Sequence, residues 1–257
     1  MAFNRGDPQT GSDIWLHDLA RGTHSRFTFN SKNNLFPTWS PDGSYIAFTS
    51  NRDGPGRVYR KATGGTGQDE IVDQDELTKR PTDWSADGRY LFEETATTTP
   101  KTSDDIWVAP MPPDGGRKPY PYLRTEFHEG RARLSPNGKW LAYTSDETKR
   151  NEVYIMTFPN PGGKWQISTS GGAEPVWSRD GKELFFISGD GKMMAVEIKG
   201  TGGNPEAGVP KALFDVRSNP SAYDVSKDGR FLIPMPLQQS ANAPITIVVN
   251  WIAGLKK

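Results

Sequence analysis

The sequence predicts an all-β protein, a β-propeller of about six four-stranded blades, and three observations point to this fold class. Gly and Pro supply 27 and 21 of the 257 residues, whereas they make up roughly 12% of an average protein. Both residues interrupt helix interiors, so the composition disfavours a helical bundle. A five-residue string recurs five times, and an apolar run of strand length follows each copy.

The recurring string has the form apolar-Ser-x-Asp/Asn-Gly. Its apolar residue ends one strand, Ser and Asp or Asn form a tight turn, and Gly accepts the positive φ that the turn requires. The Asp or Asn positions lie 43 to 50 residues apart, which is the length of a four-stranded blade. This recurrence favours a turn role for each Asp over a calcium-binding or catalytic role. The copies are residues 39–43, 84–88, 134–138, 177–181 and 225–229.

The apolar runs predict the strands of each blade. Outer strands tolerate proline and polar residues, so the weaker pattern of the fourth strands fits an edge position. Second strands are expected at residues 45–50, 90–92, 140–145, 183–188 and 231–233. Third strands are expected at 58–60, 105–108, 152–155, 192–196 and 245–249. Fourth strands are expected at 70–72, 118–122, 164–168 and 212–214.

The two ends of the chain predict incomplete blades. Residues 1–5, 13–17 and 25–29 resemble second, third and fourth strands without a first strand. The last blade stops after its third strand. No linker divides the chain, so a single propeller domain is expected over residues 1–257. The expected blades are 1–30, 35–76, 80–125, 130–170, 173–216 and 221–253.

Three of the eight Trp residues, Trp39, Trp84 and Trp177, occupy the same position of the repeat. Large aromatic side chains can fill a sheet core with few residues. We therefore expect these three to pack between blades rather than to form a sugar-binding platform.

Charge and cysteine content exclude several classes of function. The chain has 31 basic and 31 acidic residues, so it has no long-range field to hold nucleic acid phosphates. It has no Cys, which excludes disulfides, thiolate zinc sites and a cysteine nucleophile. No apolar run approaches the roughly 20 residues of a membrane span, and residues 1–10 lack the apolar segment of a signal peptide. No cofactor or metal motif is present.

The string at residues 39–43, followed by residues 46–54, closely resembles the WD40-like, or PD40, repeats of TolB-type bacterial propellers. Three segments, 145–154, 159–165 and 180–186, are similar to the propeller parts of large bacterial proteins that also carry a kinase or peptidase domain. The resemblance covers essentially the whole chain and implies a periplasmic or extracytoplasmic location for the parent protein. The chain has no kinase motif, no TolB-type N-terminal domain and no peptidase domain. Because propellers host many activities, the resemblance predicts the fold and leaves the function open.

Serine hydrolase chemistry requires a serine, a histidine and an acid within reach of one another. The chain contains no Gly-x-Ser-x-Gly string. Its three histidines are His17, His24 and His128, and their spacing suggests no zinc site. His128, just before a first strand, is the only weak catalytic candidate.

Propeller geometry predicts a ligand site where the first strands begin, because these strands line the central channel. Arg131 and Arg133 alternate, so both should face one side of a strand. Two guanidinium groups near carboxylates could hold an anionic ligand or the carboxylate of a peptide. The alternative is a structural ion-pair cluster between blades. The candidates are Asp83, Glu129, Arg131, Arg133, Glu174, Tyr223 and Asp224.

The sequence therefore favours a module that binds a protein, a peptide or a small molecule. The alternative is a hydrolase or lyase with its site at the channel mouth. The incomplete terminal blades also predict unpaired strand edges, which recruit partners by strand addition. Residues 245–249 and 1–5 could pair with each other or join two copies of the chain as a homodimer.

Overall fold

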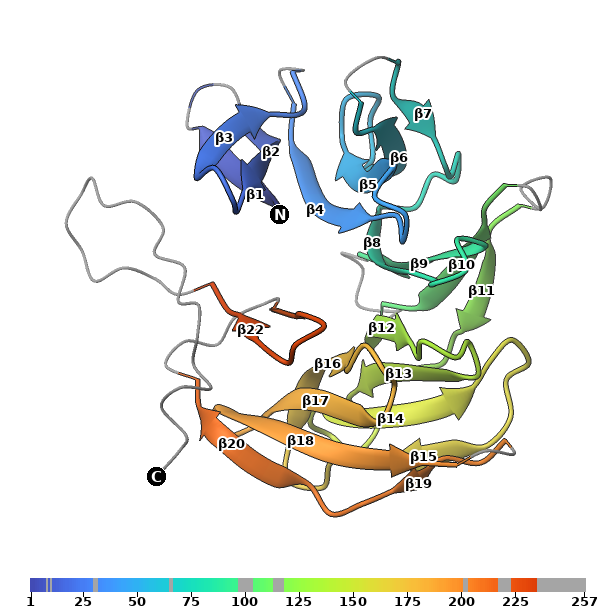
Figure 1. Cartoon of the computed structure of the whole chain (residues 1–257). Helices are drawn as coiled ribbons and strands as arrows, with labels where there is room; N and C mark the ends of the chain where they lie inside the picture. Colours follow the sequence, from blue (N-terminus) through green and yellow to red (C-terminus); the bar gives the residue numbers. More distant parts are fainter. Residues whose placement is uncertain are drawn as a thin grey trace. The chain divides into compact units, whose positions relative to one another are not determined.

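We analysed a computed structural model of the chain, which describes residues 1–7, 9, 11–29, 32–64, 67–96, 104–112, 118–200, 203–216 and 223–234. These residues form antiparallel strands joined by turns, and none of them lies in a helix (Figure 1). A membrane-spanning helix is accordingly not found in the described part of the chain. The all-β prediction is confirmed.

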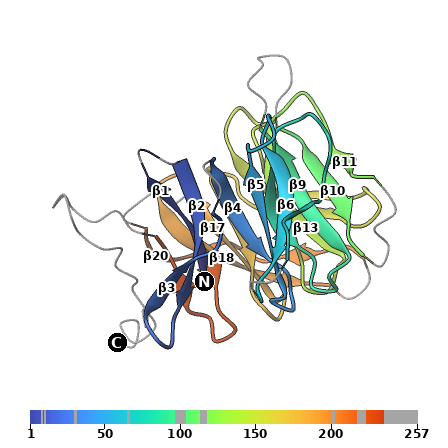
Figure 2. The same cartoon turned by 90° about the horizontal axis from the view of Figure 1, so that it is seen from above.

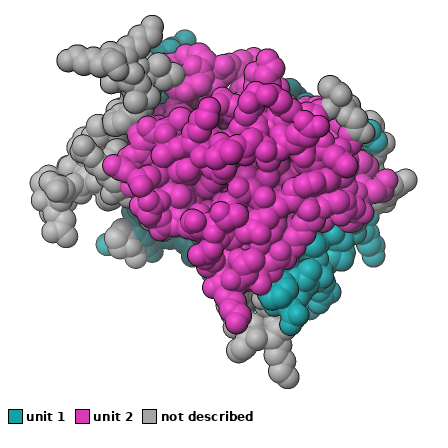
Figure 3. Space-filling model, turned by 90° about the horizontal axis from the view of Figure 1, so that it is seen from below, with its two compact units in different colours: residues 1–132 teal, residues 133–257 magenta. Residues whose placement is uncertain are grey.

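The chain divides into two compact units, residues Met1–Ala132 and Arg133–Lys257, which Figure 3 colours separately. Their boundary falls within strand β12 (Glu129–Leu134). The expectation of one domain over residues 1–257 stays a prediction.

Three sheets lie entirely within unit 1, and we call them blades 1 to 3 in chain order. In blade 2 the strands follow the order β4-β5-β6-β7, and β4, β5 and β6 lie side by side in Figures 1 and 2. Blade 1 has three strands, β1 (Ala2–Asp7), β2 (Gly11–Asp18) and β3 (Thr23–Arg26). Blade 2 has β4 (Asn34–Trp39), β5 (Tyr45–Ser50), β6 (Arg57–Ala62) and β7 (Glu70–Ile71). Blade 3 has β8 (Lys79–Trp84), β9 (Tyr90–Thr95), β10 (Ile106–Pro110) and β11 (Tyr120–Leu123).

The remaining sheets, blades 4 to 6, begin at β12. Blade 5 gains an extra strand, because both β19 and β20 pair with β18. Blade 4 has β12, β13 (Trp140–Ser145), β14 (Glu152–Thr157) and β15 (Lys164–Gln166). Blade 5 has β16 (Gly172–Trp177), β17 (Glu183–Ser188), β18 (Lys192–Lys199), β19 (Glu206–Ala207) and β20 (Lys211–Asp215). Blade 6 has β21 (Asp224–Val225) and β22 (Phe231–Leu232).

Each expected strand within the described residues is found, with small shifts of its ends. Within the described residues, blade 1 consists of β1, β2 and β3, and no first strand pairs with β1. The sequence did not predict β19, a two-residue strand, and it ended the second strand of blade 3 too early, at residue 92 instead of Thr95. The expected third strand of the last blade, residues 245–249, lies outside the described residues.

The second strands are buried on both faces, which explains their continuous apolar sequence. In β5, Ile46 and Phe48 pack with Ile14 of blade 1, whereas Ala47 packs with Leu91 of blade 3. In unit 2, both faces of strand β17 are buried in the same way. Leu184 and Phe186 pack against blade 4, and Phe185 and Ile187 pack with Tyr223 of blade 6.

The turns confirm the structural role of the repeated string. In the first copy, Ser40 Oγ donates to Asp42 Oδ1 at 2.6 Å and accepts the Tyr45 N–H at 2.9 Å. Gly43 follows with a φ of 73°. The same Ser-to-Asp or Ser-to-Asn hydrogen bond occurs in the other four copies, at Asp87, Asn137, Asp180 and Asp228. The five acidic or amide side chains therefore act as turn residues.

The three tryptophans at one repeat position differ in burial. Trp84 and Trp177 are 8% and 6% exposed and pack in the cores between neighbouring blades. Trp39 is 37% exposed, so the expectation that it packs in a core is wrong. In unit 1, Trp39 lies at the end of β4, and no described core cluster includes it.

Candidate binding site

Three first strands begin with a buried polar side chain at the same repeat position. Asn34, Lys79 and Glu129 are at most 2% exposed. Each side chain is held by a polar partner. Asn34 Nδ2 donates to Asp13 Oδ1 at 3.2 Å, Lys79 Nζ donates to an Asp73 oxygen, and the Thr125 hydroxyl donates to Glu129. The first strands of blades 2, 3 and 4 thus begin with a buried polar side chain that a hydrogen bond holds in place.

A β-bulge follows the start of β4 and the start of β16. Pairing shifts register between Leu35 and Thr38 in β4 and between Ala173 and Val176 in β16. Phe36, Arg131 and Glu174 occupy one repeat position and have φ values of 57°, 57° and 56°. Left-handed backbone costs a non-glycine residue on the order of 1–3 kcal/mol and persists where its surroundings enforce it. The left-handed backbone therefore turns two candidate side chains, Arg131 and Glu174, out of regular alternation.

Arg131 belongs to a compact charged cluster in unit 1. Its main-chain N–H donates to Glu94 Oε2 at 2.6 Å, and its guanidinium lies 3.7 Å from Glu94 Oε1. Arg80 Nε lies 3.2 Å from the same Oε1, and Arg80 Nη2 donates to Asp104 Oδ2 at 3.0 Å. His128 Nδ1 lies 3.6 Å from that Asp104 oxygen. Three basic side chains thus converge on two acids.

Gly130 makes the approach of Glu94 possible. A Cβ atom at this position would lie 2.5 Å from Glu94 Oε2, closer than non-bonded atoms can approach. The missing side chain lets the Glu94 carboxylate reach the main chain of the neighbouring blade.

Burial within the cluster separates the acids from the bases. The Glu94 and Asp104 side chains are 2% and 13% exposed, whereas those of Arg80, Arg131 and His128 are 21%, 32% and 40% exposed. The buried carboxylate of Glu94 contacts both guanidinium groups, and both arginine side chains remain partly exposed. A guanidinium carries five N–H donors in a planar fork that matches a carboxylate.

Not all of the expected unit 1 candidates join this cluster. His128 and Arg131 do. Glu129 is 2% exposed and holds the Thr125 hydroxyl, which makes it a buried structural acid. Asp83 is half-buried in β8, just after a register shift in the pairing with β9.

The other four candidates gather in unit 2, around the Tyr223 hydroxyl. Burial raises the pKa of Tyr223 well above its usual value; the positive charge of Arg133 lowers it, and the negative charges of Glu174 and Asp224 raise it. The hydroxyl oxygen is buried and forms no hydrogen bond within the described part of the chain. Asp224 lies 3.5 Å from Arg179 Nη2.

Arg80, Glu94 and Asp104 were not predicted from the sequence. A signal was present, because β9 differs from the other second strands. Where β5 has Phe48 and Thr49, β9 has Glu93 and Glu94, and both acids are buried. Two adjacent acids in a buried strand mark a place where something other than packing determines the residues.

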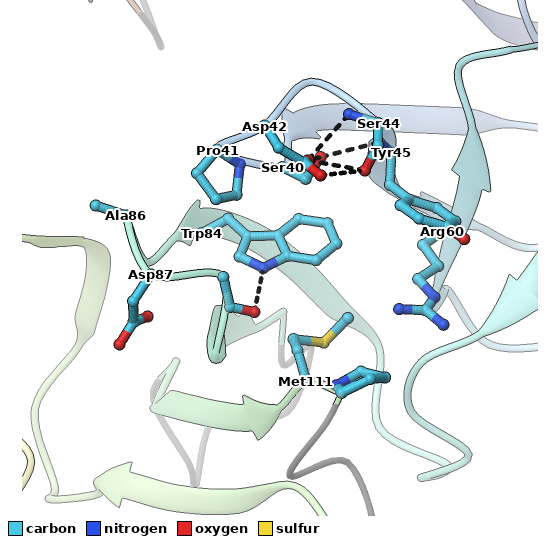
Figure 4. Close-up of a pocket in the computed structure, with 12 residues that line it drawn as sticks. Ser40, Pro41, Asp42, Ser44, Tyr45, Arg60, Trp84, Ala86, Asp87 and Met111 are labelled. Carbon is cyan, nitrogen blue, oxygen red and sulfur yellow. Dashed lines mark hydrogen bonds between the residues drawn. The ribbon is translucent and has the colours of Figure 1, made fainter.

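A second feature of unit 1 is an open hollow of about 530 Å³ beside the repeated turns of blades 2 and 3 (Figure 4). The turn of Asp42 forms one side, and Trp84 with Met111 forms the apolar floor. Trp84 Nε1 donates a hydrogen bond to the Gly88 oxygen at 3.1 Å, so the indole N–H already has an acceptor within its own turn. The described residues contain no group of three His, Cys, Asp or Glu side chains that could hold a metal ion.

No family profile matches the chain. Among curated proteins, the chain is 28% identical over 183 residues to the uncharacterized peptidase YuxL of Bacillus subtilis, matching 56% of this chain and 28% of that protein. It is 42% identical over 62 residues to the Tol-Pal system protein TolB of Syntrophus aciditrophicus, which is 24% of this chain and 13% of that protein. The chain thus spans less than a third of each curated relative.

Solved structures extend the likeness over most of the chain. TolB from Acinetobacter baumannii superposes with a TM-score of 0.70 at 17% identity, over 92% of this chain and 58% of that one. The periplasmic gluconolactonase PpgL of Pseudomonas aeruginosa gives a TM-score of 0.58 at 17% identity, over 96% of this chain and 81% of that one. Together with the antiparallel blades, these likenesses show that the chain has a β-propeller fold like that of the TolB structures.

Proposed function

We propose that the chain is a binding module that holds a carboxylate group of a protein or peptide partner between Arg80 and Arg131. The observation that carries this proposal is that both guanidinium groups approach one buried carboxylate, Glu94, and yet stay 21% and 32% exposed. Two preoriented forks give a bidentate grip on an incoming carboxylate. Because Glu94 and Asp104 hold the forks in place, little side-chain entropy is lost when a ligand binds.

The charge of the cluster supports an anionic ligand. The basic side chains Arg80, Arg131 and His128 are 21%, 32% and 40% exposed, whereas the acids Glu94 and Asp104 are 2% and 13% exposed. An incoming ligand therefore meets basic groups first. The likeness to TolB structures supports a protein or peptide as the source of the carboxylate. A periplasmic or other extracytoplasmic location is part of the same proposal, supported by the likeness to the periplasmic gluconolactonase.

Selection from a random peptide display library on the immobilised chain tests the proposal. We expect peptides rich in Asp or Glu, or ending in a free carboxylate, to be enriched. Binding of a selected peptide, followed by fluorescence anisotropy, should weaken roughly tenfold or more in Arg80→Ala and in Arg131→Ala, which corresponds to about 1.4 kcal/mol. Arg21→Ala is the matched control, because the Arg21 side chain is 81% exposed outside the cluster. Equal binding by wild type and the two cluster variants would reject the site.

A hydrolase or lyase is the second candidate function, and the His128–Asp104 pair favours it. The 3.6 Å separation between His128 Nδ1 and Asp104 Oδ2 lets the carboxylate orient the imidazole ring. The names of the relatives suggest testing peptide and lactone substrates. An activity present in wild type and lost in His128→Ala would support this candidate. Activity that survives the substitution, or no activity in wild type, would exclude His128 as its base.

The unpaired edge of blade 1 is a proposed contact for a partner strand. Among the described strands, β1 pairs with β2 alone. Strand addition to this edge, by residues 245–249 or by a second copy of the chain, would complete the sheet.

A further inference from the structure

Lys79, Glu93 and Asp73 meet at one point in unit 1, and each differs in charge from its counterparts in other blades. Lys79 stands where other first strands have Asn34, Glu129 or Gly172. Glu93 stands where the other second strands have Phe48, Tyr143 or Phe186. Asp73 stands where blades 1 and 4 have the hydroxyl residues Thr28 and Ser168, since the preceding residue donates the same main-chain hydrogen bond in each case. Three such differences at one place point to a role that the three side chains share.

The three side chains are almost completely removed from water. Lys79, Glu93 and Asp73 are 1%, 0% and 5% exposed. Lys79 Nζ contacts Asp73 Oδ2, and the Trp107 ring covers Nζ at 3.6 Å. Both carboxyl oxygens of Glu93 are buried, and Glu93 lies close enough to Asp73 for that carboxylate to raise its pKa. A buried amine, a carboxyl group in contact with it and a second buried acid thus lie together, and an indole ring covers the amine.

Glu93 is an acid of this cluster that holds a proton. Burial, and secondly the negative charge of Asp73, raises the pKa of Glu93 to about 8. Glu93 therefore carries its proton at neutral pH. A condensation between Lys79 and Asp73 requires a neutral amine and a neutral carboxyl group, and both arise when one proton passes from Nζ to the carboxylate across their contact.

We propose that Lys79 and Asp73 form an intramolecular amide crosslink, with Glu93 as the acid that transfers the protons. The Lys79 ammonium first gives its proton to Asp73, and the Nζ lone pair then forms a bond to Asp73 Cγ. Glu93 donates its proton to the departing hydroxyl group and takes one from the attacking nitrogen. The C–O bond breaks, one water molecule leaves, and Glu93 ends protonated as it began. No oxidant, metal or other reactant is needed.

The structure also selects between two possible acids. Asp75 Oδ2 lies 3.3 Å from Lys79 Nζ, but its side chain is 34% exposed, whereas that of Asp73 is 6% exposed. Burial raises the pKa of Asp75, but the positive charge of Lys79 and hydrogen bonds lower it by more, so it lies below its usual value. The exposed part of the side chain also lets water hydrolyse an activated intermediate there. Asp73 is accordingly the acyl partner.

Intact mass spectrometry of the full, natively folded chain tests the crosslink. We expect a mass lower than the sequence mass by one water molecule. Asp-Gly sequences can also lose water by forming a succinimide, so the site must be located by tryptic digestion and fragmentation. An uncrosslinked chain releases residues 62–79 after cleavage at Lys79. The crosslinked chain cannot be cut at Lys79, and Arg80 precedes Pro81, so residues 62–89 should appear together and lack one water.

Variants separate the roles of the three residues. Lys79→Arg keeps the positive charge but should show the full sequence mass. Glu93→Gln keeps the size of the side chain but cannot transfer the proton, and it should also show the full mass. Asp75→Asn is the matched control and should retain the crosslink. A full-mass wild type, or release of residues 62–79 from the native chain, would overturn the proposal. Loss of water between Lys79 and Asp73 in Glu93→Gln would overturn the role given to Glu93.

Discussion

The indole Nε1 of Trp177 donates a 3.0 Å hydrogen bond to the main-chain oxygen of Arg133, in the first strand of the preceding blade. Trp84 occupies the same repeat position, but its Nε1 bonds to Gly88 within its own turn. The same residue type thus connects two blades in unit 2 by a hydrogen bond and by packing, and in unit 1 by packing alone.

The buried position of Trp84 predicts a large effect of truncation. Trp84→Ala should lower the free energy of unfolding by about 3–5 kcal/mol, because it opens a cavity between blades 2 and 3. Trp39→Ala is the matched control, since Trp39 is 37% exposed at the equivalent position, and its cost should be clearly smaller. Urea denaturation followed by circular dichroism measures both. Equal losses for the two variants would show that burial does not distinguish these positions.

Gly130 predicts a link between packing and the binding cluster. Gly130→Ala places a Cβ 2.5 Å from Glu94 Oε2 and must displace that carboxylate from Arg131. We expect a loss of about 1–3 kcal/mol of stability, as for other overpacked sites, together with weaker binding of an acidic peptide. Gly64→Ala is the control, because a Cβ there meets no atom within 4 Å. If the two variants bind the peptide equally well, Glu94 does not position the arginines.

The repeated string made most of the fold predictable. A turn such as residues 40–43 depends on a few adjacent side chains, and the apolar run of β5 depends on burial of both faces. Both are local properties that a single sequence displays. The fourth strands were found for the same reason, although β7 shortens to two residues.

The binding cluster was only partly predictable, because it depends on register and on backbone shape. Regular alternation would set Arg131 and Arg133 on one face, but Arg131 has a left-handed backbone with a φ of 57°. Its main-chain N–H bonds to Glu94, a residue 37 positions earlier in the chain. Neither the backbone conformation nor this pairing leaves a local pattern in the sequence. The buried acids of β9 were visible only as departures from the repeat, and the sequence analysis did not use them.

Glu93 predicts a fall in stability with rising pH. Its pKa is raised to about 8 in the folded chain, chiefly by burial, whereas an unfolded Glu has a pKa near 4.3. Between these values the folded state holds one proton more than the unfolded state, so the stabilisation is complete below about pH 4 and is lost as the pH rises through about 8. Burial persists in the crosslinked chain, so the direction is the same.

Urea denaturation from about pH 5 to about pH 9 measures this dependence. The wild type should lose up to about 1.4 kcal/mol of unfolding free energy per pH unit from this group within the window. Glu93→Gln cannot ionise and should show a flatter profile. Identical profiles for the two proteins would mean that Glu93 is already ionised in the folded chain.

The last prediction concerns the edge of β1. The hydrogen bonds between β1 and β2 show which main-chain N–H and C=O groups of β1 point away from β2. Met1 and His17 exchange both main-chain hydrogen bonds, so they form a hydrogen-bonded pair of the antiparallel ladder. Pairs alternate along such a ladder, which makes Asn4, opposite Ile14, a non-hydrogen-bonded pair. The N–H and C=O groups of Asn4 therefore face the unpaired edge.

Asn4→Pro removes one outward donor without removing a bond to β2, and proline is tolerated on edge strands. If a second copy of the chain pairs with β1, light scattering over a concentration series should show a wild-type dimer that Asn4→Pro weakens. Asn4→Ala, which keeps the N–H, is the matched control and should dimerise as the wild type does. A wild type that remains a strict monomer at every concentration, or an Asn4→Pro variant that dimerises equally well, would reject self-association through this edge, because main-chain hydrogen bonds supply the affinity of strand addition.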